Sequence, residues 1–158
     1  MKDSSSHWNN TKTFLDAFAV RAGAADSKAR AARTFDVFVG SESFLLANLR
    51  HGGVGTISAT ANVNPAPIHS LFAEATTRQG AGSASGLQLE ARQAKLNVVR
   101  EVFSSTKFPS MIAALKQAIA IYRNDPEWAR VRPPLIELTP EQAKILAAEM
   151  KAVGFSMG

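Results

Sequence analysis

The hydrophobic positions divide the chain into a part with short apolar runs and a part with helical spacing only. Two runs, 35–39 and 54–58, are short and rich in β-branched or aromatic residues, which predicts buried strands. A helix with an apolar face is expected after each run, over 42–50 and from Pro65 to just before Gly80. Strands that alternate with helices in this way are typical of right-handed βαβ units and a parallel sheet.

Helical spacing accounts for most of the remaining chain, and capping signals mark where some helices begin. Ser85 with Gln88, and Thr139 with Gln142, have the spacing of a capping box. Residues 23–34 lack an apolar stripe and are expected to form an irregular connection. The further predicted helices cover 11–22, 85–103, 109–122 and 140–154, with a Gly/Ser/Ala turn at 80–86 before the second.

Composition agrees with a folded, cytoplasmic protein. The chain has 158 residues, of which 46% are hydrophobic and 20% charged, so it can bury a core. No apolar run approaches the roughly 20 residues that span a bilayer, and no apolar leader follows Met1, so we expect neither membrane insertion nor export. Cysteine is absent, which excludes disulfides and thiolate chemistry.

The charge balance is basic, with 18 Lys and Arg against 13 Asp and Glu. The densest basic stretch contains Lys28, Arg30 and Arg33, interleaved with alanines and without an aromatic residue that could stack on a base. We therefore interpret it as a solvated surface and expect no nucleic-acid partner. A modest positive field would equally suit a small carboxylate substrate.

General motifs for metals, cofactors and hydrolases are absent. His7, His51 and His69 are widely separated, and none stands at metal-ligand spacing with another ligand. Gly53-Val54-Gly55 has Ser58 where a dinucleotide fingerprint needs its third glycine. No nucleophile elbow occurs. We therefore expect no metal, no cofactor and no hydrolase chemistry.

Three segments together are more specific. They are Lys2-Asp3-Ser4-Ser5, then Val39-Gly40-Ser41-Glu42, then the run GGVGTISATAN over 52–62. In order and spacing they resemble the last strands of the dihydrodipicolinate synthase / N-acetylneuraminate lyase family. Phe108-Pro109 and the segment 134–154 resemble the C-terminal three-helix appendage of that family.

The resemblance implies an α/β fold, namely the C-terminal portion of a (β/α)8 TIM barrel with strands 6 to 8, followed by a three-helix appendage. The expected division is a partial barrel over 1–80 and helices over 81–158. A whole barrel takes roughly 250 residues, so the first five strands are expected to lie outside this chain.

The resemblance also implies a site. Lys2 matches the lysine that forms a Schiff base with pyruvate or another 2-oxo acid, while Gly40 and Ile57 match positions whose backbone lines the same pocket. Ser6 stands where the family usually has glycine. An imine-forming lysine needs a neutral amine, and burial in a barrel mouth would favour one. Barrel active sites lie at the C-terminal ends of strands, where all three site residues fall. The alternative to these functional roles is that Lys2 is a solvated terminal residue and that Ile57 is a core residue of its strand.

Two functions remain open. The first is the C-terminal part of a Schiff-base lyase of the aldolase, dehydratase or synthase type. Its Lys-Asp-Ser-Ser form resembles the sugar-acid members of the family more than the lysine-pathway synthase. The second is a non-catalytic remnant or interaction module. We expect the chain alone to be inactive, because the family's carboxylate pocket and catalytic tyrosine belong to earlier strands and Tyr122 falls on an appendage helix. The complete enzyme is expected to be a homo-oligomer, and the fragment to self-associate through unpaired strand edges.

Overall fold

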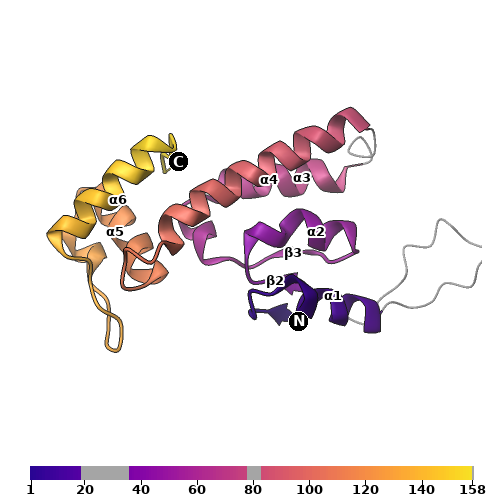
Figure 1. Cartoon of the computed structure of the whole chain (residues 1–158), viewed down its shortest axis with the longest axis horizontal. Helices are drawn as coiled ribbons and strands as arrows, with labels where there is room; N and C mark the ends of the chain where they lie inside the picture. Colours follow the sequence, from indigo (N-terminus) through magenta and orange to yellow (C-terminus); the bar gives the residue numbers. More distant parts are fainter. Residues whose placement is uncertain (19–35, 78–82, 158) are drawn as a thin grey trace, which may run out of the picture. The chain divides into compact units, whose positions relative to one another are not determined.

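The computed structural model describes residues 1–18, 36–77 and 83–157. The predicted connection over 23–34, including its basic stretch, lies outside these residues, as do residues 80–82 of the predicted turn at 80–86. The rest of that turn was predicted wrongly, because 83–86 form the first turn of a helix. The elements are, in chain order, β1 (Lys2–Asp3), α1 (Trp8–Ala17), β2 (Phe38–Val39), η1 (Glu42–Phe44), α2 (Leu45–Arg50), β3 (Gly55–Thr56), η2 (Ala59–Asn62), α3 (Pro65–Thr76), α4 (Ser83–Ser104), α5 (Met111–Arg123), η4 (Pro126–Ala129) and α6 (Pro140–Ala152) (Figure 1).

The three strands form a parallel sheet in the order β1-β2-β3. Lys2 pairs with Phe38, and Phe38 pairs with Gly55. The strands are shorter than the predicted runs, although backbone hydrogen bonds continue past both ends of β3, from the Val54 amide to the Val37 carbonyl (3.0 Å) and from the Ile57 amide to the Val39 carbonyl (2.9 Å). The predicted parallel arrangement is therefore present. Within the described ranges, β1 and β3 each pair with β2 alone.

The helices lie where capping residues and helical spacing predicted them, with small differences at their ends. At the start of α6, the Thr139 hydroxyl accepts from the Gln142 amide and the Gln142 side chain accepts from the Thr139 amide, so the predicted capping box is confirmed. The helix predicted from Ser85 begins at Ser83 instead, and the first helix begins at Trp8 rather than at residue 11. Helix α5 begins after Ser110, whose hydroxyl caps the Ala113 amide.

The chain divides into two compact units, each assembled from two segments. Unit 1 comprises 1–58 and 70–93, and unit 2 comprises 59–69 and 94–158. In unit 1, Arg92 of α4 contacts Glu74 (3.0 Å) and Ser70 (3.0 Å) of α3, so these parts of the two helices lie side by side (Figure 1). The predicted division at residue 80 stays a prediction.

Each unit has its own buried apolar residues. In unit 1, the two valines of the β2 segment, Val37 and Val39, are fully or almost fully buried, as are Leu45 and Leu71. Unit 2 contains a larger cluster, whose buried members are Val63, Val102, Phe103, Phe108, Ala114, Leu115, Ala118, Leu146 and Met150. Among the helices in the described ranges, none is long and apolar enough to cross a membrane.

Candidate active site

The sheet of unit 1 brings the three predicted site residues to one edge. Lys2 lies on β1, Gly40 directly after β2, and Ile57 directly after β3. Because side chains alternate along a strand and Lys2 is level with Phe38 and Gly55, positions 40 and 57 fall on the same face as Lys2. Three segments far apart in sequence therefore present one continuous surface at the C-terminal edge of the sheet.

Lys2 is exposed, and so is half of the Ile57 side chain (50%). Gly40, in contrast, is tightly enclosed by backbone. Its amide donates to the Asp3 carbonyl (2.7 Å), and a Cβ at this position would lie 2.7 Å from that same oxygen and 3.0 Å from the Ser4 Cα. Only glycine fits this close approach, so the residue type at 40 has a direct steric reason.

Asp3, the neighbour of Lys2, anchors the turn that follows β1. Its carboxylate accepts hydrogen bonds from the Ser5 amide (2.9 Å), the Asn10 side chain (3.1 Å) and the Thr11 hydroxyl. Burial raises the pKa of the Asp3 carboxyl, but the bonds from Thr11, Ser5 and Asn10 outweigh burial and hold the pKa below its usual value. The end of β1, and with it Lys2, is thus tied to helix α1.

The loop after Asp3 also explains the departure at Ser6. Its φ of 61° lies in the left-handed region that favours glycine. A glycine, which the family usually has here, would adopt this left-handed conformation without steric cost, and Ser6 adopts it although it carries a side chain.

A buried carboxylate, which the sequence did not single out as functional, lies behind the site. Glu42 is 1% exposed and accepts a hydrogen bond from the Ser58 hydroxyl. Ser58 follows Ile57, and Glu42 lies two residues after Gly40, so this contact joins the two loops that carry predicted site residues. The Val39-Gly40-Ser41-Glu42 motif includes Glu42, but a single sequence does not indicate that its side chain is buried or that it contacts Ser58.

Gln93 of α4 fixes the same loop from the other side. Its side chain donates to the Glu42 carbonyl (2.9 Å) and accepts from the Leu46 amide (3.0 Å). Asn48 of α2 joins the sheet more directly, since its amide donates to the carbonyls of Val37 (3.2 Å) and Gly55 (2.9 Å). Buried polar side chains therefore hold the loops after β2 and β3 at a fixed spacing.

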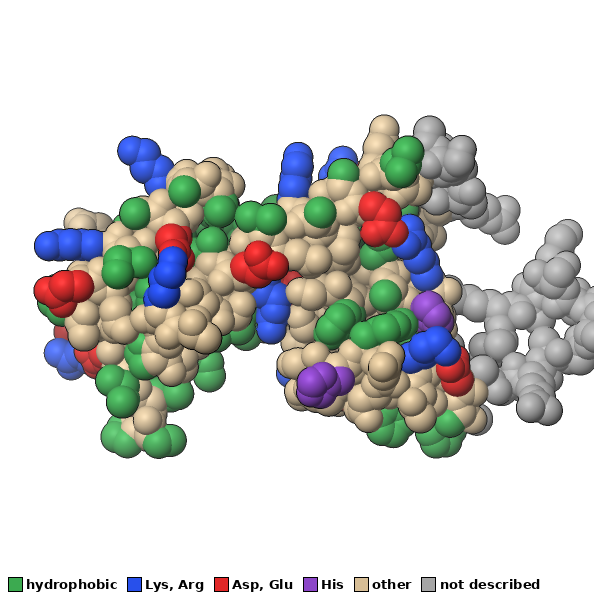
Figure 2. Space-filling view, viewed as in Figure 1, with side chains coloured by type: hydrophobic (Ala, Val, Ile, Leu, Met, Phe, Trp, Pro, Cys, Tyr) green, Lys and Arg blue, Asp and Glu red, His purple; other side chains and the backbone are tan. Residues whose placement is uncertain are grey.

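The surface charge has no single basic stripe on the face that Figure 2 draws. Lys and Arg side chains are scattered there, with Asp and Glu between them. Several pairs are close enough to interact, such as Lys107 with Glu149 and Arg50 with Glu90. This face offers a mixed surface with small local fields.

Comparison with known proteins places this geometry in a family. The model of the dihydrodipicolinate synthetase family matches residues 18–153, and the chain belongs to this family. A relative from Lachnoclostridium phytofermentans, 4-hydroxy-tetrahydrodipicolinate synthase, is 31% identical over 119 residues, which cover 75% of this chain and 37% of the relative.

Solved structures of the family share the fold. The dihydrodipicolinate synthase of Thermotoga maritima superposes with a TM-score of 0.70 at 19% identity, over 97% of this chain and 45% of that protein. A catalytic-lysine mutant of the Ruminococcus gnavus sialic acid aldolase gives a TM-score of 0.67 at 18% identity, over 96% and 43%. The chain thus has an α/β fold matching these proteins and spans less than half the length of each relative it matches here.

Proposed function

We propose that this chain carries the imine-forming part of a Schiff-base lyase that acts on pyruvate or a related 2-oxo acid. Lys2 is the nucleophile, and the backbone at Gly40 and Ile57 lines the substrate. The observation that carries the proposal is the shared edge of the sheet, where these three positions occupy one face. The same edge carries the active site in barrel enzymes.

The chemistry requires few groups from this part of the protein. The Lys2 amine attacks the 2-oxo carbon, and loss of water leaves a carbon–nitrogen double bond that withdraws electrons from the neighbouring carbon. A catalytic lysine in the Ruminococcus gnavus aldolase, named as such for that protein, supports the assignment by analogy.

The exposed position of Lys2 leads to a further expectation. Lys2 is exposed, whereas lysines that form imines are typically desolvated in an enclosed pocket, so we expect an additional protein segment to cover Lys2 in the working enzyme. We propose that the missing cover is the N-terminal part of such a barrel, and that the chain alone has no appreciable lyase turnover. A homo-oligomer and a sugar-acid substrate belong to the same proposal.

Trapping the imine tests this directly. The purified chain is incubated with pyruvate and borohydride, alone and together with the separately expressed N-terminal barrel segment of a family relative, and the modified peptides are identified by mass. We expect an adduct on Lys2 only in the mixture, lost in Lys2→Arg and retained in the control Lys12→Arg, which changes another lysine of the same unit. An adduct spread over several lysines would contradict the assignment.

The non-catalytic alternative has its own supporting observation, namely the exposure of Lys2 together with the outer strands β1 and β3, which in the described residues each pair with β2 alone. It predicts no adduct on Lys2 in either condition. The same experiment therefore separates the two functions.

A further inference from the structure

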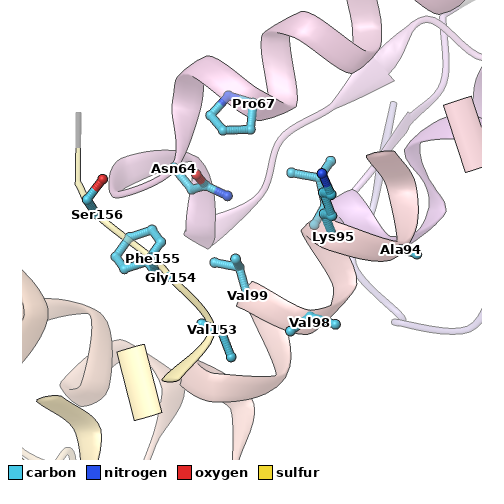
Figure 3. A pocket seen from close by; sticks show the side chains of 11 residues that line it. Asn64, Pro67, Ala94, Lys95, Val98, Val99, Val153, Gly154, Phe155 and Ser156 are labelled. Carbon is cyan, nitrogen blue, oxygen red and sulfur yellow. The ribbon is translucent and has the colours of Figure 1, made fainter. Parts of the chain in front are cut away.

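Unit 2 contains a pocket of about 610 Å³ that the reaction proposed above does not use. Cavities that hold small molecules typically measure roughly 300–1,000 Å³. Figure 3 shows its walls, which come from the start of α3, from the middle of α4 and from the segment after α6. None of its lining residues belongs to the unit that carries Lys2, so the inference does not depend on the proposed lyase function.

The segment after α6 forms a firm wall because its backbone reverses and bonds to the helix. Gly154 has a φ of 65°, and the Phe155 amide then donates to the Met150 carbonyl (2.9 Å). The Phe155 ring meets Phe103 of the core edge to face, with centroids 5.4 Å apart. Val99 packs against the same core cluster. The pocket therefore has an apolar floor supported by the core of unit 2.

One polar side chain inside this pocket has no partner. Asn64 is 7% exposed and lines the pocket. Within the described parts of the chain, its side-chain amide makes no hydrogen bond, which leaves both its donor and its acceptor available to a molecule in the pocket. Figure 3 shows it directed into the space enclosed by Pro67, Val99 and Phe155. An amide in this setting can both donate to and accept from a bound molecule.

A positive charge stands across from Asn64. Lys95 of α4 is exposed, lines the pocket and, among the residues with a described position, makes no ion pair. In Figure 3 Asn64 and Lys95 face the space from opposite sides. The lining thus combines an ammonium group, an unpartnered amide and apolar walls, which is the arrangement that recognises an anion with an apolar body.

We propose that this pocket binds a small carboxylate with an apolar chain. The carboxylate pairs with the Lys95 ammonium, one of its oxygens accepts from the Asn64 amide, and the chain lies against Val99 and Phe155.

Octanoate is a suitable probe, with 1-octanol as its neutral counterpart. Its ten non-hydrogen atoms, at the modest efficiency of ordinary ligands, predict saturable binding with a Kd of about 1 mM or tighter. Calorimetry gives the affinity and stoichiometry for the full chain, and the amide shifts of Val99 and Phe155 in an NMR titration locate the site. Lys95→Met keeps the aliphatic length and removes the charge, while Lys144→Met makes the same change on α6, away from the pocket.

We expect Lys95→Met to weaken octanoate roughly tenfold and to leave octanol unchanged, and Lys144→Met to change neither. Val98→Trp, at a rim position that is 46% exposed, should fill the pocket and abolish binding while circular dichroism stays that of the unaltered chain. The proposal is overturned if octanoate does not saturate, if its affinity is unchanged by Lys95→Met, if both lysine variants weaken it equally, or if the shifted amides lie outside the pocket.

Discussion

The contact between Glu42 and Ser58 gives the most direct test of how the loops of the candidate site are held. Both side chains are buried, with 1% and 8% exposed, and the contact joins the loop after β2 to the loop after β3. A hydrogen bond to a carboxylate contributes roughly 1.5–3 kcal/mol to stability. We therefore expect Ser58→Ala and Glu42→Gln each to lower the free energy of unfolding, with a coupling energy in that range in a double-mutant cycle.

The chain allows this coupling to be read from unit 1 alone. It has two tryptophans, and Trp8 lies beside Phe44 of η1 with ring centroids 6.2 Å apart. In a Trp128→Phe background, urea unfolding followed by tryptophan fluorescence reports on the unit that contains Glu42. Ser43→Ala is the matched control, since its hydroxyl lies in the same turn and makes no hydrogen bond to another residue that the structure describes.

The control should change the unfolding free energy by less than about 0.5 kcal/mol, because Ser43 is only half-buried and its hydroxyl makes no hydrogen bond among the described residues. A coupling energy below about 0.5 kcal/mol between Glu42 and Ser58 would refute the reasoning, because contacting residues that support each other do not act additively. The loops would then be held by the backbone and by Gln93 instead.

Four further outcomes follow from the same unit. Asp3→Asn should lower the free energy of unfolding by about 1.5–3 kcal/mol at neutral pH. Because the folded pKa of Asp3 lies below its usual value, this contribution is complete above about pH 4 and is lost as the pH falls through the folded pKa. Unfolding measured at a series of pH values would show this loss. Ser6→Gly should raise stability by about 0.5–1 kcal/mol through relief of the positive φ, whereas Ser6→Ala should give no gain in thermal unfolding. Gly40→Ala should destabilise by roughly 1–3 kcal/mol through a backbone clash, while Gly86→Ala, with open space around its Cβ, should not destabilise the chain. Light scattering should find self-association through the outer edges of β1 and β3, which pair with no further strand among the residues that the structure describes, and hydrogen exchange should be fast in 37–39 and 54–58.

Each has a clear contrary result. A pH-independent difference for Asp3→Asn would mean that folding does not lower the pKa of Asp3. Equal gains from glycine and alanine at position 6 would exclude the φ argument, and a tolerated Gly40→Ala would mean that β1 moves away freely. A monodisperse 16.9 kDa monomer with slow exchange in the strands would show that the chain protects the edges of its own sheet.

The sequence by itself determined the local elements and the positions that belong to strand ends. The capping box at Thr139 and Gln142 needs residues only three apart, so a local pattern was enough to predict it. The two strand-helix alternations predicted a parallel sheet, and the resemblance of the motifs to the family implied which residues would meet at its edge. Lys2, Gly40 and Ile57 then came to one face because parallel strands share a register.

Only the tertiary structure decided which polar groups are buried and what they contact. The Ser58 hydroxyl bonds to Glu42, 16 residues away in sequence, and the Gln93 side chain bonds to the Glu42 carbonyl, 51 residues away. The periodic patterns of helices and strands do not predict contacts between residues so far apart in sequence. The unpartnered amide of Asn64 was equally invisible, because the sequence suggested only a helix start there. Burial depends on which segments pack together, and that is a property of the folded chain rather than of any local stretch.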